Sequence, residues 1–197
     1  IARRVSARPW LYTWIYAVFF VVVAFVLNLP WAIYSGFVRE HQYGLATQDF
    51  AGWFGDALKM LMVNAIVLPL VLIAVYAAVR RAGARWWIWA SAIAFVFALF
   101  AMMLAPVYVE PLFNDYKPLR EGAAREAILS LARANGIPTN HVVEFDASRQ
   151  TTRISANVAG FAGTTRVAMN DNLLNKTSLP EIKAVLGHEM GHYVLNH

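Results

Sequence analysis

The sequence contains no cysteine and little charge. With no cysteine among its 197 residues, the chain has no disulfide framework, and its redox compartment stays undetermined. Charged residues make up 15% of the chain and hydrophobic residues 59%, far from the balance of soluble domains. Repeats and low-complexity segments are also absent from the sequence. The composition therefore favours an integral membrane protein.

The net charge of +5 is compatible with nucleic-acid binding, but the pattern of basic residues disfavours it. The arginines cluster beside apolar runs rather than on one polar face. Basic residues that flank apolar segments are typical of membrane proteins. We therefore expect membrane lipid, and no nucleic acid, among the partners.

Three segments are apolar over the roughly 20 residues that a helix needs to cross a membrane. The predicted spans are residues 9–37, 60–79 and 86–109. Buried core helices of a soluble protein are disfavoured because these segments are apolar all round. Asn64 and Pro69 interrupt the second span, and we interpret them as helix-packing residues, with a substrate-lining role as the alternative. The sequence thus predicts a multi-span transmembrane helical bundle within residues 1–109.

The composition changes after Glu110, where turn residues appear and the charges balance. We predict an amphipathic helix over 118–135 and a small antiparallel sheet. Its strands are predicted at 141–145, 154–161 and 166–169, and Asn170-Asp171-Asn172 is predicted to turn the chain toward the next helix. Residues 37–50, between the first two spans, are predicted to form a polar loop, with His41 as a solvated residue rather than a metal ligand.

The last segment carries His188-Glu189-Met190-Gly191-His192, an HExxH motif. On a helix, residues four apart lie on one face, so both imidazoles can reach one ion, and neutral imidazole suits Zn²⁺. Glu189 lies about 100° round the helix, where it can take a proton from a water whose pKa the metal lowers toward ~7. The motif predicts a zinc peptidase site, with a structural His/Glu helix as the alternative.

The start of this helix is marked by Ser178 and Glu181, which form a capping-box pattern with Pro180 at the first helical position. Gly187 and Gly191 lower helix propensity, and we interpret them as places where another group approaches the helix closely. The apolar residues expected to make contacts around the histidine-bearing face are Ile182, Val185, Leu186 and Tyr193.

The order helix, sheet, HExxH helix suggests how a substrate binds. In metallopeptidases with this plan, an extended peptide pairs with an exposed strand edge near the metal. The best candidate edge contains the predicted substrate-binding residues Ser155, Ala156, Asn157 and Gly160. The alternative is an ordinary sheet strand.

Several motifs, in one order along the chain, resemble the type I CaaX prenyl endopeptidase family of integral-membrane gluzincin zinc proteases. They are the segments 37–45, 56–59, 111–119, 166–174 and 185–192. The resemblance implies a seven-helix membrane bundle around a hydrophilic chamber, with a small α+β gluzincin-type portion. It also implies His188 and His192 as zinc ligands, Glu189 as general base, and peptide substrates that are prenylated or otherwise membrane-associated.

The resemblance implies a third zinc ligand, a glutamate on a later helix. We therefore expect residues 110–197 to be the N-terminal part of a metallopeptidase domain, truncated after the HExxH helix, in a chain that is a fragment. Glu181 lies about 10 Å along the helix axis from His188, too far to share its ion, and His197 does not fit the metzincin spacing. Because two protein ligands are too few for a catalytic zinc site, we expect this 197-residue chain to bind zinc weakly and to be inactive.

Two departures from the family pattern concern substrate contacts. Ser155-Ala156 leads to Gly160 where the family shows Asn-Ala-x-x-x-Gly, and Arg153 replaces a family histidine. The basic residues slightly favour a catalytic part outside the cytoplasm, whereas the resemblance implies the cytoplasmic side, which we adopt. The alternatives to a CaaX-type protease are an HtpX-type membrane quality-control metalloprotease and a non-catalytic membrane scaffold.

Overall fold

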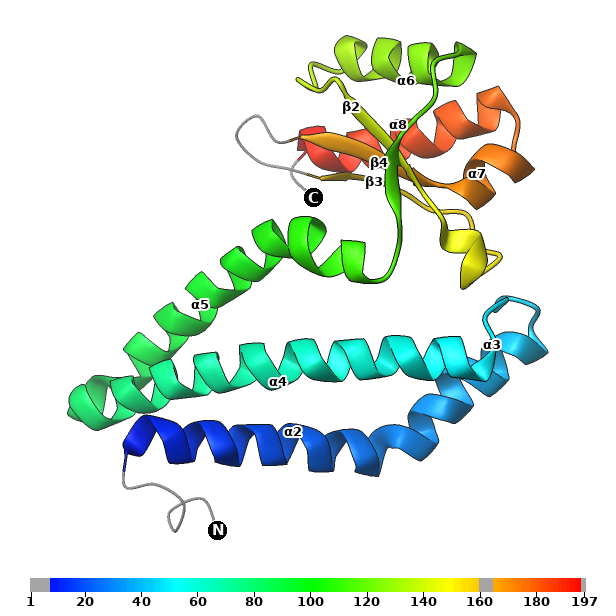
Figure 1. Cartoon of the computed structure of the whole chain (residues 1–197). Coiled ribbons are helices and arrows are strands. Elements are labelled where there is room, and N and C mark those ends of the chain that lie inside the picture. The colour runs from blue at the N-terminus through cyan, green and yellow to red at the C-terminus, as the bar shows by residue number, and fades with distance from the viewer. Residues whose placement is uncertain (1–7, 160–164, 196–197) are drawn as a thin grey trace. The chain divides into compact units, whose positions relative to one another are not determined.

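The structure, a computed structural model, describes residues 8–159 and 165–195 (Figure 1). The chain divides into two compact units. The first unit comprises Ile1–Arg39 and Asp49–Ala105, and the second comprises Glu40–Gln48 and Pro106–His197. The short segment between the first two long helices is therefore part of the second unit.

The first unit is built from long apolar helices. They are α2 (Pro9–Ile33), continued by a π-helix at Tyr34–Val38, α4 (Phe50–Arg81) and α5 (Trp86–Leu104). Helix α4 packs against both α2 and α5. Within the described residues, three helical segments are long and apolar enough to cross a membrane: Pro9–Gln42, Phe50–Arg81 and Gly83–Leu112. The mainly helical, membrane-spanning fold class predicted from the sequence is confirmed.

Helix α4 begins ten residues before the predicted second span. The Asp49 carboxylate accepts a hydrogen bond from the Gly52 amide at 2.8 Å, a side-chain N-cap that starts the helix at Phe50. Asp56 and Lys59 consequently lie on the helix rather than after a loop, and they form an ion pair at 2.9 Å. Hydropathy alone missed this polar first part of the helix.

The second unit is a four-stranded sheet with helices. Its strands are β1 (Tyr116–Pro118), β2 (His141–Phe145), β3 (Ala156–Ala159) and β4 (Arg166–Asn170), in the spatial order β1-β2-β4-β3. Its helices are α6 (Ala123–Ala134), α7 (Asp171–Lys176) and α8 (Leu179–Leu195). Buried side chains on one face of the sheet, including Val167 and Met169, pack with Ile128 of α6 and Leu186 of α8 to form the core.

Three details of the predicted second unit are wrong. The sheet is mixed, because β2 and β4 run parallel while the other two pairings are antiparallel. The helix expected over 118–135 begins only at Ala123, since Pro118 belongs to β1 and Gly122 has a left-handed φ of 155°. The turn expected after β4 is helix α7, which Asn170 caps by accepting from the Leu173 amide.

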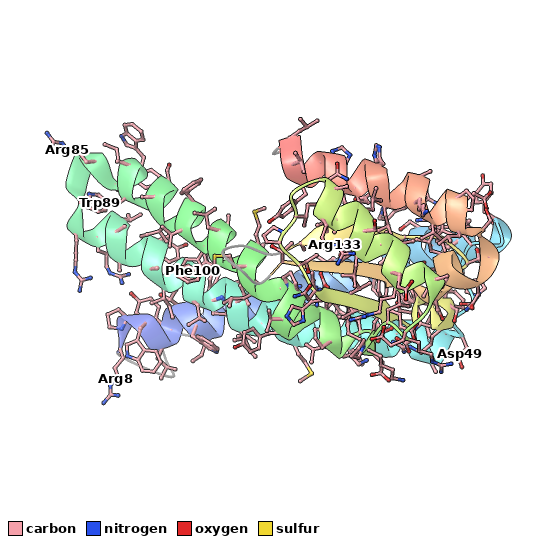
Figure 2. The ribbon with its side chains drawn as sticks, turned by 90° about the horizontal axis from the view of Figure 1, so that it is seen from above. Arg8, Asp49, Arg85, Trp89, Phe100 and Arg133 are labelled. Atoms are coloured by element: carbon pink, nitrogen blue, oxygen red, sulfur yellow. The ribbon has the colours of Figure 1, made fainter. Side chains whose placement is uncertain are left out.

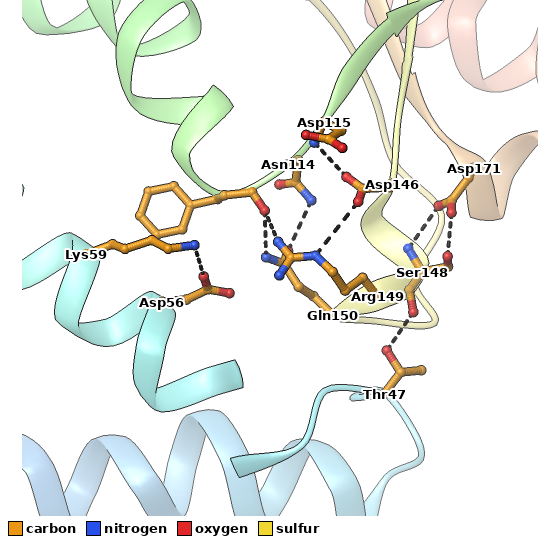
Figure 3. Close-up of polar contacts among 11 residues, drawn as sticks. Thr47, Asp56, Lys59, Asn114, Asp115, Asp146, Ser148, Arg149, Gln150 and Asp171 are labelled. Carbon is orange, nitrogen blue, oxygen red and sulfur yellow. Dashed lines mark hydrogen bonds and ion pairs between the residues drawn. The ribbon is translucent and has the colours of Figure 1, made fainter. Parts of the chain in front are cut away.

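The segment Glu40–Gln48 pairs with residues about one hundred positions later in the chain. Thr47 donates from its amide to the Gln150 carbonyl at 3.1 Å, and Thr152 donates from its amide to the Leu45 carbonyl at 3.0 Å. The Thr47 hydroxyl also donates to the Ser148 carbonyl at 2.7 Å (Figure 3). This polar segment is thus a packed part of the second unit rather than a free loop.

Candidate metal site and neighbouring strand edge

Helix α8 begins with the interaction that the sequence predicted. The Ser178 amide and the Ser178 hydroxyl each donate a hydrogen bond to Glu181 Oε2, both at 2.7 Å. A glutamate that returns to the backbone amide of the capping residue is one half of a capping box. Leu179 is the first residue of the helix, so Pro180 occupies the second helical position, one later than predicted.

The hydrogen bonds from the Ser178 hydroxyl and amide lower the pKa of Glu181 below its ordinary value of 4.5. A carboxylate with a depressed folded-state pKa stabilises the fold above its unfolded pKa and loses that effect as the pH falls through the folded one. We therefore expect Glu181→Gln to lower the melting temperature of the complete protein at pH 7. The difference from wild type should shrink as the pH falls below 4.5. A difference of equal size at pH 3 and pH 7 would contradict this assignment.

The two faces of α8 differ sharply in burial. Ile182, Leu186 and Met190 are buried in the core. His188 and His192 lie on the exposed side of the helix, and Glu189 between the two faces is half-buried. Val185 and Tyr193 are partly buried against the same core, so the apolar contacts lie away from the histidines rather than around them.

The two imidazoles lie next to each other on one side of α8. His188 Nε2 and His192 Nε2 are 3.0 Å apart, and the ring planes are perpendicular. Two nitrogens at Zn–N distances of ~2.0–2.1 Å in tetrahedral coordination are about 3.3 Å apart. The observed separation is slightly shorter than this value and is also a hydrogen-bonding distance, so the donor set is compatible with a metal.

The described residues do not provide a complete set of metal ligands. No group of three or more His, Cys, Asp or Glu side chains able to hold a metal occurs within residues 8–159 and 165–195. Within the same residues, the space that a Cβ would enter at Gly187 and at Gly191 has no atom within 4 Å. The prediction that another group approaches the helix closely at these glycines is therefore not confirmed by the described residues.

Helix α8 packs directly against β3, which lies at the edge of the sheet. Ser155, just before β3, accepts from the Asn170 amide at 2.9 Å and donates from its own amide to Asn170 Oδ1 at 3.0 Å. Backbone groups alternate in direction along an antiparallel strand. The backbone N–H and C=O of Ser155 point toward β4, so those of Asn157 also point toward β4. The backbone N–H and C=O of Ala156 and Val158 therefore point to the outer edge of the sheet, away from β4.

This alternation distinguishes the predicted substrate-binding residues by the direction of their backbone groups, and their role in binding stays a prediction. Ala156 presents backbone groups to the edge, while those of Ser155 are already bonded within the sheet. Asn157 has a buried Oδ1 without a hydrogen-bond partner among the described residues. Gly160 lies outside the described residues.

Two buried asparagines, which the sequence reasoning did not select, hold the approach to β3. Asn170 Nδ2 donates to the Arg153 carbonyl at 2.7 Å, and Asn172 Nδ2 donates to the Thr151 carbonyl at 2.7 Å. Their exposed fractions are 1% and 2%. Their sequence signal, a pair of asparagines directly after a strand, was interpreted only as a turn.

Arg153 also joins the approach to β3 to the segment Glu40–Gln48. Its guanidinium forms an ion pair with Glu40 at 2.6 Å. The strand edge beside α8 is thus positioned by side chains from β4, from α7 and from the segment between the first two long helices.

Family profiles match nearly the whole chain. Residues 1–115 match the profile described as CAAX prenyl protease N-terminal, five membrane helices, and residues 118–197 match that of peptidase family M48. The chain is similar to the uncharacterized metalloprotease YhfN of Bacillus subtilis, with 33% identity over 87% of this chain and 39% of that protein. It is also similar to CAAX prenyl protease 1 of Saccharomyces cerevisiae, with 32% identity over 87% of this chain and 38% of that protein.

A solved structure shares the fold. The crystal structure of S. mikatae Ste24p matches 98% of this chain and 46% of that chain, with a TM-score of 0.88 at 28% identity. The chain spans about two fifths of the length of the two curated relatives named above.

Proposed function

Because the chain belongs to the CAAX prenyl protease family of M48 metallopeptidases, we propose that the protein is a membrane zinc metalloendopeptidase that cleaves peptides with a prenylated CAAX-type terminus. Membership of this family implies a metal cofactor. The observation that carries the proposal is the pair of imidazole nitrogens 3.0 Å apart on α8, on the exposed face of a helix that packs against an edge strand.

His188 and His192 would hold the zinc ion through Nε2. When bound, zinc supplies Lewis-acid activation of a water molecule and of the scissile carbonyl. The Glu189 carboxylate accepts the proton that the attacking water loses and delivers it to the leaving amine nitrogen. Glu189 is half-buried between the exposed and buried faces of α8 and is adjacent in sequence to His188.

The outer edge of β3 would bind the substrate as an added strand. Ala156 and Val158 would each offer an amide and a carbonyl to an extended peptide, which gives affinity without selecting side chains. Each hydrogen bond contributes about 0.5–1.5 kcal/mol. N-methylation of substrate amides that pair with this edge should raise KM by roughly 2- to 13-fold per bond, while N-methylation of the alternate amides should change it little.

The preference for a prenylated peptide rests on the similarity to CAAX prenyl proteases of several organisms. The match of residues 1–115 to the N-terminal CAAX prenyl protease profile favours this function over the quality-control alternative. The match of residues 118–197 to peptidase family M48 supports a catalytic function over a scaffold.

The deciding experiment uses the complete parent protein purified in detergent. Cleavage of matched farnesylated and unprenylated peptides would be followed with and without a metal chelator. We expect chelator-sensitive cleavage that favours the farnesylated peptide. Equal cleavage of both peptides would overturn the prenyl preference but keep the peptidase, and absence of cleavage with zinc bound would overturn the enzymatic proposal.

We place the catalytic part on the cytoplasmic side, in line with the family resemblance and against the slight excess of basic residues on the other side. A single cysteine introduced at Glu121, whose side chain is 81% exposed, tests this in intact cells, with any cysteines outside this chain replaced. Labelling should require a membrane-permeant reagent. Labelling of intact cells by an impermeant reagent would reverse the orientation.

A further inference from the structure

One end of the first unit is rich in arginine, and the described residues at this end include no Asp or Glu. Arg8 precedes α2, Arg80 and Arg81 end α4, and Arg85 precedes α5. Arg8 and Arg85 lie at the same end of the unit in Figure 2, and Asp49 lies at the other end. The only acidic residues in the described part of this unit, residues 8–39 and 49–105, are Asp49 and Asp56, and Asp56 pairs with Lys59.

Three of these arginines have unused hydrogen-bonding capacity. Arg80, Arg81 and Arg85 are exposed. Within residues 8–159 and 165–195, none of the three forms an ion pair. A guanidinium binds phosphate through two parallel hydrogen bonds, so this end of the unit is complementary to an anionic group.

A groove of about 330 Å³ between α4 and α5 opens at this end. Its α4 side is formed by Ala74, Ala77, Ala78 and Arg81, which share one helix face at spacings of three and four residues. Ala74 lies about 10 Å along the helix from Arg81. The groove, called here the arginine groove, therefore combines one cationic side chain with an apolar floor that runs into the membrane-spanning segment.

Tryptophans mark the depth at which the arginine groove lies. Trp89 lines the groove and is 59% exposed, and Trp86 and Trp87 begin the same helix. Tryptophan is enriched at the level of the lipid headgroups. Arg81 at the end of α4 is accordingly expected at the depth of lipid phosphates, with the alanine floor at the depth of acyl chains.

We propose that the arginine groove binds one anionic phospholipid, whose phosphate pairs with Arg81 and whose acyl chain lies along the alanine face of α4 against Trp89. A guanidinium beside an apolar groove is suited to an anionic phosphate headgroup in either leaflet. The rival explanation is that the arginines only offset the partial negative charge at the carboxyl end of α4. That explanation makes Arg80 and Arg81 equivalent, whereas Arg81 lines the groove and Arg80 does not.

The test compares Arg81→Gln with Arg80→Gln, a matched control one residue away. The complete parent protein in non-ionic detergent would be titrated with phosphatidylglycerol or phosphatidylcholine, and retained lipid would be counted by native mass spectrometry. We expect one retained phosphatidylglycerol, an affinity loss of about tenfold or more in Arg81→Gln, and little change in Arg80→Gln. Equal losses in both variants, or equal retention of phosphatidylcholine, would overturn the proposal.

Two further measurements separate a lipid from its headgroup. Inorganic phosphate at millimolar concentration should not displace the bound lipid, because it lacks the acyl chain; displacement would overturn the lipid assignment.

Brominated acyl chains should quench the tryptophan fluorescence of the wild-type protein more than that of Trp89→Phe. Trp10→Phe serves as a control outside the groove. A quenched fraction that Trp89→Phe leaves unchanged would show that the acyl chain does not lie in the arginine groove. None of these measurements depends on peptidase activity.

Discussion

Glu189→Gln in the complete protein is expected to reduce turnover by a factor on the order of 10²–10⁴, the usual contribution of a general base. The amide of glutamine keeps the size of the side chain but does not accept a proton at neutral pH. His188 and His192, with nitrogens 3.0 Å apart, stay in place, so metal content and fold should be retained. The loss should appear in kcat rather than in KM.

The measurement is steady-state cleavage of the preferred peptide by metal-loaded protein, with the metal content determined for each variant. Glu126→Gln is the matched control, because Glu126 is an exposed glutamate of the same unit on α6. Near-normal turnover of metal-loaded Glu189→Gln would show that another group takes the proton. A parallel loss of metal would instead mean that Glu189 supports the ligands.

Asn170→Ala should lower the free energy of unfolding of the second unit by about 2–5 kcal/mol. Asn170 Oδ1 accepts from the Ser155 amide at 3.0 Å and from the Leu173 amide at 2.9 Å, in a site where the residue is 1% exposed. Removal of the side chain leaves both amides without this acceptor and removes the N-cap of α7. The Arg153 carbonyl is less affected because Asn172 also donates to it at 3.1 Å.

Tryptophan fluorescence is not a suitable measurement of this change, because all seven tryptophans, from Trp10 to Trp89, belong to the first unit. Hydrogen exchange of the peptides that contain β3 and β4 is the better measurement, and faster exchange there is expected. Asn170→Asp keeps the acceptor for both amides and should recover part of the protection. Asn135→Ala is the control, because it removes a single exposed hydrogen bond to the Leu131 carbonyl. Similar exchange in the two alanine variants would contradict the role given to Asn170.

The features that the sequence predicted well are those encoded locally. The three apolar segments identified the long helices, because the length and apolarity of a segment suffice to predict a membrane-spanning helix. Ser178 and Glu181 predicted the start of α8 through a contact that spans three residues. The roles of His188, Glu189 and His192 stay predictions, although the 3.0 Å between the two imidazole nitrogens is compatible with a shared ion.

The features that the sequence did not predict depend on partners far along the chain. Alternation identified β2 and β4 as strands but carries no information on direction, so their parallel pairing was missed. Asn170 and Asn172 gain their role from carbonyls of Thr151 and Arg153, which no local pattern indicates. The polar start of α4 was missed because Asp49 caps it ahead of the apolar run.

The pairing of the segment Glu40–Gln48 with the second unit constrains the order in which the protein folds during synthesis. The hydroxyl of Thr151 donates to the Leu45 carbonyl across a sequence separation of 106 residues. This segment leaves the ribosome between two membrane-spanning helices, long before its partners have been made. Because its partners are synthesised after α2, α4 and α5, the second unit completes its fold only after these helices have been made. Contacts of such high sequence separation also form slowly. A separately expressed piece that begins at Pro106 would lack the segment and would be expected to need it added in trans.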